Sequence, residues 1–345
     1  MSIPTSTRAW ILKKKPEDKL DVASTFAVEE RPLAELTDGK VLVKVLYLSN
    51  DPAQRTWISA SVVPDRAYGP CPQEGDAMPS AFLGKVVATK SAKFEEGSLV
   101  KGFGSWSEYL VLSEAGIQPA QYPKNLPESS AISTLGLTAM TAWVGLHRIG
   151  QIKKEHTVVI SGAAGATGSA AVQIAKKLVG CKRVVGIAGG KEKCEWVKKL
   201  GADECLDYRS STFAEDLAKA TEGYVDVYYD NVGGSILNLM FKRMARFSRI
   251  IACGFISAYD SSDAVDLSNF FEVISMRITV QGFIVTDNAE DFPSATNELT
   301  KAIENGTFIV EGTEHKVEAS FDEVPKTWQL LFSGGNTGKL ITQLK

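Results

Sequence analysis

A glycine-rich turn lies near the middle of the chain, where an apolar strand is followed by an apolar helix. The expected strand Thr157–Ser161 leads into Gly162-Ala163-Ala164-Gly165-Ala166-Thr167-Gly168, and a helix is expected over Ser169–Leu178. In such a turn Gly165 lets a phosphate group approach the backbone, and Gly168 lets the helix pack closely on the strand. The N–H groups at the start of the helix, together with the helix dipole, favour negative charge. The turn therefore predicts binding of a dinucleotide pyrophosphate; the alternative is a tight turn without a ligand.

The end of the next expected strand, Arg183–Ala188, distinguishes between the two nicotinamide cofactors. An NAD site normally places Asp or Glu there, to bind the ribose 2′-hydroxyl. Here the chain reads Gly189-Gly190-Lys191-Glu192-Lys193, without an acid at the strand tip. A 2′-phosphate requires cations and hydrogen-bond donors. The sequence therefore predicts NADPH, with Lys193 as the cation and Tyr208, at the end of the third strand, as a hydroxyl donor. The alternative is that Lys191 and Lys193 form a solvated helix face.

These side chains need a sheet to position them, and the second part of the chain has the pattern of one. From about Glu128 onwards, apolar strands alternate with helical patterns, which is typical of a parallel sheet covered by helices. Six strands are expected, at Thr157–Ser161, Arg183–Ala188, Glu204–Tyr208, Val225–Asp230, Arg249–Gly254 and Ile278–Phe283. Helices are expected between them, at Ser169–Leu178, Glu192–Leu200, Phe213–Ala220, Ser235–Met244 and Glu290–Glu304. This alternation predicts the α/β class and a doubly wound, Rossmann-type parallel sheet.

The first part of the chain has a different texture. Short alternating or apolar runs, such as Val41–Tyr47 and Leu83–Ala88, are separated by Gly, Pro and Asp clusters such as Asp65–Gly75. Short strands with such turn signals predict a barrel-like β domain. The tail returns to strand character at Leu340–Leu344, so it could close back onto this domain.

The length of the chain suits two domains. Its 345 residues correspond to about two units of roughly 100–200 residues each. We expect a β-rich substrate domain at residues 1–127, completed by residues 316–345. The dinucleotide-binding domain is expected at residues 128–315.

The composition is that of an ordinary globular protein, with 44% apolar and 23% charged residues. A formal net charge of −3 gives no indication of a nucleic-acid partner or of an anionic membrane surface. No apolar run reaches the roughly 18–20 residues that span a bilayer, and a secretory signal is not expected. The five cysteines are an odd number and widely separated, which favours reduced thiols in the cytoplasm.

A metal site is not expected. The three histidines, His147, His156 and His315, have no cysteine at ligand spacing, and the chain contains no Cys-x-x-Cys. At the position expected for a Gly-His-Glu zinc motif, the chain reads Phe82-Leu83-Gly84-Lys85. Without a Lewis acid to activate an alcohol, reduction of an electron-poor double bond is the more natural hydride chemistry.

Seven short motifs spread over nearly the whole chain can be compared with known families. They are Leu46–Pro52, Gly136–Ala139, Ala163–Gly168, Gly189–Lys193, Asp230–Gly234, Gly254–Tyr259 and Gly335–Lys339. Together they resemble those of the leukotriene B4 12-hydroxydehydrogenase/prostaglandin reductase group. These are zinc-free medium-chain dehydrogenases/reductases, and they include alkenal double-bond reductases.

The resemblance implies a GroES-like β-rich substrate domain, a Rossmann domain within the chain, NADPH as the reductant and a homodimer. The NADP contacts that it implies fall on Gly165, Ala166, Thr167, Gly168, Lys193, Tyr208, Asn231, Cys253, Gly254, Phe255, Ile256, Ser257, Tyr259, Phe283, Ile284, Val285 and Asn336. Asn231 and Asn336 would offer amide groups to ribose or phosphate, and Phe283–Val285 would offer backbone groups to the nicotinamide carboxamide. The alternatives are turn-forming asparagines and ordinary strand core.

The chain departs from the family pattern at two positions, and the first departure leaves the substrate open. Many relatives have Tyr-Met-Arg where this chain has Ala53-Gln54-Arg55, so a tyrosine of the substrate pocket is missing. Gly190 stands where many relatives have serine, which removes one phosphate contact.

The expected function is NADPH-dependent reduction of the C=C bond of an α,β-unsaturated aldehyde or ketone, by hydride transfer to the β-carbon. Charge would build on the carbonyl oxygen, where a donor is needed. Tyr259 is the candidate for this role or for orienting the nicotinamide ribose; the alternative is a structural loop aromatic. Two other functions remain open: an NADPH quinone reductase on the same fold, and a non-catalytic NADPH-binding protein.

Assembly can be predicted from the last strand of the sheet. The apolar run Ile278–Val285 is expected at the sheet edge, and an exposed apolar edge favours pairing with another chain. The sequence thus predicts a homodimer with two-fold symmetry.

Overall fold

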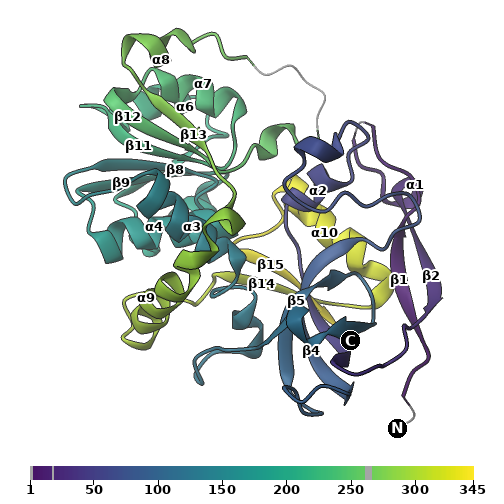
Figure 1. The fold of residues 1–345 in the computed structure, drawn as a ribbon. Coiled ribbons are helices and arrows are strands. Elements are labelled where there is room, and N and C mark those ends of the chain that lie inside the picture. Colours follow the sequence, from purple (N-terminus) through teal and green to yellow (C-terminus); the bar gives the residue numbers. More distant parts are fainter. Residues whose placement is uncertain (1–2, 18, 261–265) are drawn as a thin grey trace. The chain divides into compact units, whose positions relative to one another are not determined.

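The computed structural model describes residues 3–17, 19–260 and 266–345, and its contacts divide them into two units (Figure 1). The first unit runs to Ser133 and also contains His315–Gly335 and Leu340–Lys345. The second contains Thr134–Glu314 and Asn336–Lys339. The C-terminal tail, expected to lie wholly in the first domain, is therefore divided between the two.

A six-stranded sheet in the order β10-β9-β8-β11-β12-β13 forms the centre of the second unit. Its strands are β8 (Thr157–Ser161), β9 (Arg183–Ala188), β10 (Glu204–Asp207), β11 (Val225–Asp230), β12 (Met244–Ala252) and β13 (Thr279–Gly282). Every neighbouring pair is parallel. The predicted doubly wound sheet is confirmed, and β8, β9 and β11 have the predicted bounds.

Strand β12 differs most from the expectation. The sequence predicts a helix up to Met244 and a strand only from Arg249, whereas the strand begins at Met244. The reason is a long-range contact: Met244 is paired with Val225 of β11, whose N–H donates to the carbonyl of Arg243 at 2.9 Å. Helical periodicity in the sequence does not reveal this pairing.

Helices cover both faces of the sheet, with α6 and α7 on one face and α3 and α4 on the other (Figure 1). The helices of this unit are α3 (Leu137–Val144), α4 (Ala166–Gln173), α5 (Lys191–Lys199), α6 (Phe213–Ala220), α7 (Gly234–Phe241), α8 (Phe271–Ser275) and α9 (Phe292–Glu304). One-turn π-helical segments extend α3 over Gly145–Ile149 and α4 over Ile174–Val179. A continuous apolar core joins β8, β9 and β11 to α6 and α7, through fully buried side chains such as Val159 and Tyr228.

The first unit contains a second sheet in the order β14-β15-β3-β4-β5-β7, with β6 paired to β3, and a separate β1-β2 hairpin. Its strands are β1 (Ser6–Leu12), β2 (Phe26–Pro32), β3 (Lys40–Ser49), β4 (Pro79–Thr89), β5 (Leu99–Ser105), β6 (Tyr109–Ser113), β7 (Ile117–Pro119), β14 (Glu314–Ala319) and β15 (Lys339–Leu344). Its helices are α1 (Val22–Thr25), α2 (Ala53–Trp57) and α10 (Val324–Ser333). Strand β15 pairs antiparallel with β3, which confirms that the tail returns to the strands of the first part of the chain.

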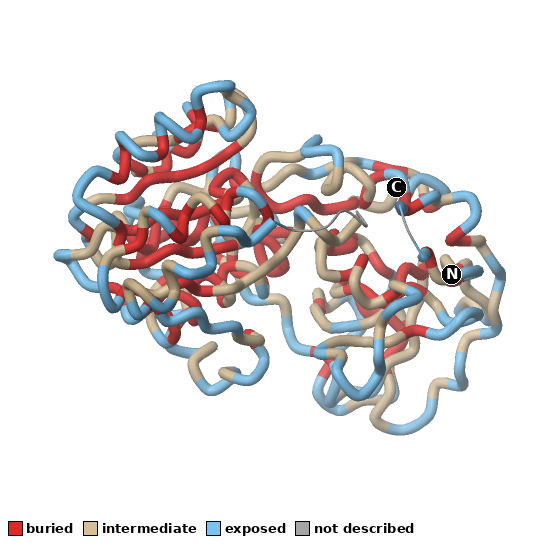
Figure 2. Tube along the Cα trace, turned by 90° about the horizontal axis from the view of Figure 1, so that it is seen from above, coloured by how far each residue is buried: buried red, intermediate tan, exposed pale blue. Residues whose placement is uncertain are grey.

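Each unit has its own buried interior (Figure 2). In the first unit, Trp106 and Trp328 are fully buried and their rings lie 5.5 Å apart in an edge-to-face arrangement. Trp328 comes from the tail helix α10, so the tail contributes core as well as a strand.

Candidate active site

The glycine turn lies between β8 and α4, as predicted. Gly162 has a φ of +58°, which starts the turn, and Gly165 precedes the first residue of α4. A Cβ on Gly168 would lie 2.2 Å from the carbonyl oxygen of Gly162, so no side chain fits there. Gly168 therefore allows the close helix–strand contact expected of it. The N–H groups of Ala166 and Thr167 belong to the first turn of α4, where they have no intrahelical acceptor.

A buried carboxylate, Asp230, lies at the end of β11 and joins it to β8. Only 1% of Asp230 is exposed. Its Oδ1 accepts four hydrogen bonds, from Ser161 Oγ (2.9 Å), the Tyr228 hydroxyl (2.8 Å) and the N–H groups of Val232 (3.0 Å) and Gly233 (2.9 Å). Burial raises the pKa of Asp230, while these four donors act in the opposite direction. This role was not predicted from the sequence, although Asp230 is the first residue of the motif Asp230–Gly234.

Asn231 is fixed against the end of β8. Its Nδ2 donates to the carbonyl of Ser161 at 2.7 Å, and its backbone N–H donates to Ser161 Oγ at 3.0 Å. Its Cβ lies 3.3 Å from the position of a Cβ on Gly162. The asparagine is thus placed beside the glycine turn, with its amide N–H group bound to the protein backbone.

The loop after β12 is hydrogen-bonded to the turn that follows β11, which begins at Asp230 and continues through Val232. The N–H groups of Cys253 and Gly254 both donate to the carbonyl of Asp230, at 2.9 and 3.0 Å. Further along, Ser257 donates to the carbonyl of Val232 through both its N–H (3.1 Å) and its Oγ (2.7 Å). The loop that carries residues 253–257 is therefore held at the carboxyl ends of β11 and β12.

Cys253 directs its thiol into the protein. The hydroxyl of Tyr229 donates to Cys253 Sγ at 3.4 Å, and burial raises the pKa of the Cys253 thiol to about 12. The structure therefore leaves backbone atoms, rather than the thiol, as the groups that Cys253 could offer to a ligand.

The side chain of Tyr259 contacts the backbone of the same loop. Its phenol oxygen accepts a hydrogen bond from the N–H of Phe255 at 3.1 Å, and it lies 3.5 Å from the position of a Cβ on Gly254. This places the phenol at the carboxyl end of β12, close to the Asp230 turn that the loop contacts.

A basic corner is formed where β9 and β10 end. The ring of Tyr208 rests on Gly189, where an added Cβ would lie within 2.8–2.9 Å of the ring and hydroxyl. The guanidinium of Arg209 lies 5.8 Å from the centre of the Tyr208 ring. Burial lowers the pKa of Lys193, and the nearby charge of Arg209 lowers it further. Two of these residues were predicted, while Arg209 was missed; the signal for it was its position directly after Tyr208.

This corner fits the phosphate that distinguishes NADP from NAD. An added Cβ on Gly190 would meet no atom within 4 Å, so there is open space beside the cations. The end of β9 carries Gly189 and Gly190 instead of an acid. The charge and the space both suit a 2′-phosphate.

Four residues of the tail lie against the glycine turn. The N–H of Gly338 donates to the carbonyl of Ala164 at 2.8 Å, and Gly338 forms an isolated parallel bridge with Gly165. Asn336 Nδ2 donates to the carbonyl of Gly338 at 3.0 Å, so its amide shapes its own turn. The tail turn that contains Asn336 is thus tied to the glycine turn through Gly338, and residues 336–339 belong to the second unit.

Phe283–Val285 follow the edge strand β13. The ring of Phe283 packs on Gly145, since an added Cβ there would lie 3.0 Å from Phe283 Cζ. The carbonyl of Ile284 accepts from the N–H of Asp287 (3.1 Å) and from Asn288 Nδ2 (3.2 Å). The contacts described for this segment run to α3 and to its own turn, so its proposed role toward nicotinamide stays a prediction.

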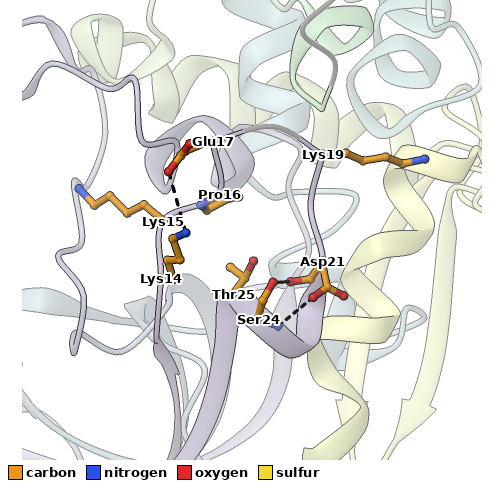
Figure 3. Close-up of a pocket in the computed structure, with 8 residues that line it drawn as sticks. All are labelled: Lys14, Lys15, Pro16, Glu17, Lys19, Asp21, Ser24 and Thr25. Atoms are coloured by element: carbon orange, nitrogen blue, oxygen red, sulfur yellow. Dashed lines mark hydrogen bonds and ion pairs between the residues drawn. The ribbon is translucent and has the colours of Figure 1, made fainter.

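In the first unit, Gln54 stands where many relatives have methionine, and its role is structural. Its side chain is fully buried; Oε1 accepts from the N–H of Asp51 and Nε2 donates to the carbonyl of Pro79, both at 2.8 Å. A surface pocket of the same unit is lined by residues between Lys14 and Thr25, and it contains none of the predicted site residues (Figure 3).

Within residues 3–17, 19–260 and 266–345, no three His, Cys, Asp or Glu side chains lie close enough together to hold a metal ion. Within the same residues, no helix is long and apolar enough to cross a membrane.

Comparison with known proteins identifies the family. Residues 8–120 match the family described as the N-terminal domain of oxidoreductase, and residues 166–301 match that described as zinc-binding dehydrogenase. The chain is 33% identical to the NADPH-dependent curcumin reductase of Escherichia coli (98% of this chain, 96% of the relative). It is 35% identical to prostaglandin reductase 1 of Bos taurus (97% and 98%).

A solved structure agrees with these matches. CurA of Vibrio vulnificus in complex with NADPH superposes with a TM-score of 0.89 at 31% identity, over 98% of this chain and 99% of that one. The chain therefore belongs to the medium-chain dehydrogenase/reductase family, in the zinc-free group that contains the prostaglandin and curcumin reductases.

Proposed function

We propose that this protein uses NADPH to reduce the C=C bond of α,β-unsaturated aldehydes or ketones. The observation that carries the proposal is that one sheet carries two features that an NADP site requires. The glycine turn follows β8, and the basic corner of Lys193, Tyr208 and Arg209 lies at the ends of β9 and β10. The names of the curcumin and prostaglandin reductases, each at least 33% identical to this chain, support the substrate class.

When bound, NADPH supplies the hydride that adds to the β-carbon of the substrate. Negative charge then builds on the carbonyl oxygen of the substrate, and we assign the phenol of Tyr259 as the donor that meets it. Its position on the Gly254 backbone at the end of β12 supports this role.

Other residues of the chain prepare this site without contacting the reacting atoms. Asp230 holds the ends of β8 and β11 together, and the loop that carries Tyr259 is bonded to the turn that follows Asp230. These hydrogen bonds restrict the conformations of the loop, which favours a preorganised donor. All five thiols are free, which favours a reducing compartment, and we propose the cytoplasm.

Consumption of NADPH tests the proposal when four reactions are compared: with an enal, with an enone, with a quinone and without an acceptor. We expect turnover with the enal or the enone, a product heavier by two hydrogens in mass spectrometry, and no loss of activity after prolonged chelation. Turnover with the quinone alone would show a quinone reductase instead. NADPH binding without turnover of any acceptor would show a binding protein.

A further inference from the structure

We propose that Arg209 is a further specificity-determining residue, which shares the 2′-phosphate of the cofactor with Lys193. We also propose that Asp207 is the positioning residue that sets these two cations on either side of the phosphate. The inference rests on the proposed NADPH dependence and adds two residues to it. The ligand group is a phosphate monoester on the adenosine ribose.

The carboxylate of Asp207 ties the end of β9 to the end of β10. Its Oδ1 accepts from the N–H of Gly190 at 2.8 Å and from the N–H of Arg209 at 3.0 Å. These two bonds lower the pKa of Asp207. Gly190 is the residue directly before α5, and Lys193 lies in the first turn of that helix. One carboxylate oxygen therefore fixes the spacing between the two segments that carry the cations.

Lys193 and Arg209 carry like charges, and the segments that bear them are tied together by Asp207. The charge of Arg209 contributes to the lowered pKa of Lys193, which also has a burial component. Within the first turn of α5, the helix dipole adds further positive potential. An anion with two negative charges, such as a phosphate monoester, relieves this repulsion when it binds between the cations.

Tyr208 limits where the guanidinium of Arg209 can lie. The tyrosine ring is pressed against Gly189, and the guanidinium carbon of Arg209 lies 5.8 Å from the ring centre. A planar guanidinium near an aromatic ring can present its N–H groups to a phosphate as a preformed fork. Arg209 is otherwise exposed, so its loss should not disturb the fold.

A second possible role for Asp207, direct binding of the cofactor ribose, must be distinguished from the positioning role. Its carboxylate could accept a hydrogen bond from the ribose 2′-hydroxyl, as the acid of an NAD site does. The two backbone bonds on Oδ1 favour the positioning role. The roles differ in the effect of Asp207→Asn, which keeps an acceptor oxygen and removes the charge.

The experiment measures four dissociation constants by isothermal titration calorimetry: for NADPH, NADH, adenosine 2′,5′-bisphosphate and AMP. The last two differ only in the 2′-phosphate, so they report on this group without any turnover. The variants are Arg209→Ala and Lys193→Ala. The matched control is Arg246→Ala, which removes an exposed arginine near the amino end of β12, where a parallel sheet does not bind its ligand.

We expect Arg209→Ala to raise the dissociation constants of NADPH and the bisphosphate by about tenfold to a hundredfold, which is the range of one charge-assisted hydrogen bond. The dissociation constants of NADH and AMP should change by less than about twofold, and NADPH binding should depend less steeply on salt concentration. Equal loss for NADPH and NADH, or no loss for either, would overturn the inference. If the native protein prefers NADPH and only Lys193→Ala removes the preference, the inference fails and the cofactor assignment stands. A native protein without a preference would overturn both.

The variants Asp207→Asn and Asp207→Ala test the positioning role. Asparagine keeps the acceptor oxygen, so we expect the bisphosphate to bind at least as tightly as to the native protein. Alanine removes the acceptor, and we expect it to raise the dissociation constant of the bisphosphate by at least about fivefold, while that of AMP changes little. Weaker binding of NADH to Asp207→Asn, with unchanged bisphosphate binding in Asp207→Ala, would show instead that Asp207 binds a ribose hydroxyl.

Discussion

Tyr259 is the side chain on which the proposed chemistry most depends. Its phenol is oriented by the N–H of Phe255 at 3.1 Å, within a loop that is bonded to the turn after β11. A group held in this way loses little freedom when charge develops beside it, which is the condition for transition-state stabilisation by a single donor. The same contact would also suit a residue that only shapes the loop.

Replacement of Tyr259 by phenylalanine separates these roles. If the phenol donates to the substrate oxygen, kcat for an enone should fall by about tenfold to several hundredfold, while the NADPH dissociation constant stays nearly unchanged. Steady-state kinetics and a direct NADPH titration of both proteins measure the two effects. Tyr224→Phe is the matched control, because Tyr224 is half exposed and precedes the amino end of β11.

Weaker NADPH binding by Tyr259→Phe would instead assign the phenol to the nicotinamide ribose. An unchanged kcat would remove Tyr259 from the mechanism, although the reductase assignment could stand.

Among the strands, β8 and β11 are joined at their carboxyl ends by the buried Asp230. Its single oxygen accepts from Ser161 of β8 and from two N–H groups of the following turn. The arrangement fixes the position of the glycine turn relative to the loop after β12. It also carries a cost, because burial raises the pKa of Asp230 and so disfavours its charged form.

The pH dependence of stability should reveal this cost. Since the folded state binds the Asp230 proton more tightly than the unfolded state does, this residue makes the free energy of unfolding fall as pH rises from the ordinary carboxyl pKa through the raised one. Asp230→Asn cannot ionise and keeps an acceptor oxygen. Its free energy of unfolding, relative to that of the native protein, should therefore rise as the pH increases above the ordinary carboxyl pKa of about 4.

Urea unfolding at several pH values provides this measurement. Asp287→Asn, which changes an exposed carboxylate, should leave the difference from the native protein constant across the same range. A constant difference for Asp230→Asn as well would contradict the prediction.

At the scale of the whole molecule, the edge of the parallel sheet is the important feature. Strand β13 is the last strand of the sheet, as expected, and all four of its residues are exposed. Val280 on this strand is 44% exposed, and Phe271 and Ile274 of the preceding helix α8 are 70% and 65% exposed. An edge strand flanked by exposed apolar side chains favours association, so we propose a homodimer that pairs β13 with β13 of a second copy.

Multi-angle light scattering tests the assembly. At micromolar concentration we expect the mass of a dimer for the native protein and of a monomer for Val280→Lys. Two-fold symmetry would bring both introduced lysines into one interface, where like charges repel. Val63→Lys places a lysine at an exposed valine of the first unit and should remain dimeric. A native protein that is already monomeric would disprove the proposal.

The sequence was sufficient to predict the six strands of the parallel sheet, apart from the start of β12, and the glycine turn that follows β8. Apolar runs such as Val158–Ile160 are buried on both faces of a parallel sheet, so they are visible as continuous hydrophobic segments. The start of α4 at Ala166 lies three residues before the predicted Ser169. The glycine pattern around this start and the absence of an acid after Ala188 are likewise local features. Each of these depends on neighbours only a few residues away, and for this reason composition and spacing revealed them.

The tertiary structure decided which distant residues complete the site. Asp207 is linked to Gly190, 17 residues earlier, and the tail residue Gly338 to Ala164, by single hydrogen bonds that have no periodic signature. Asn231 and Cys253 were predicted as ligand contacts, yet their Nδ2 and Sγ atoms contact other parts of the protein. Sequence spacing says which residue types can reach a site, but which of their atoms remain available depends on the bonds that packing forms between segments far apart in the chain.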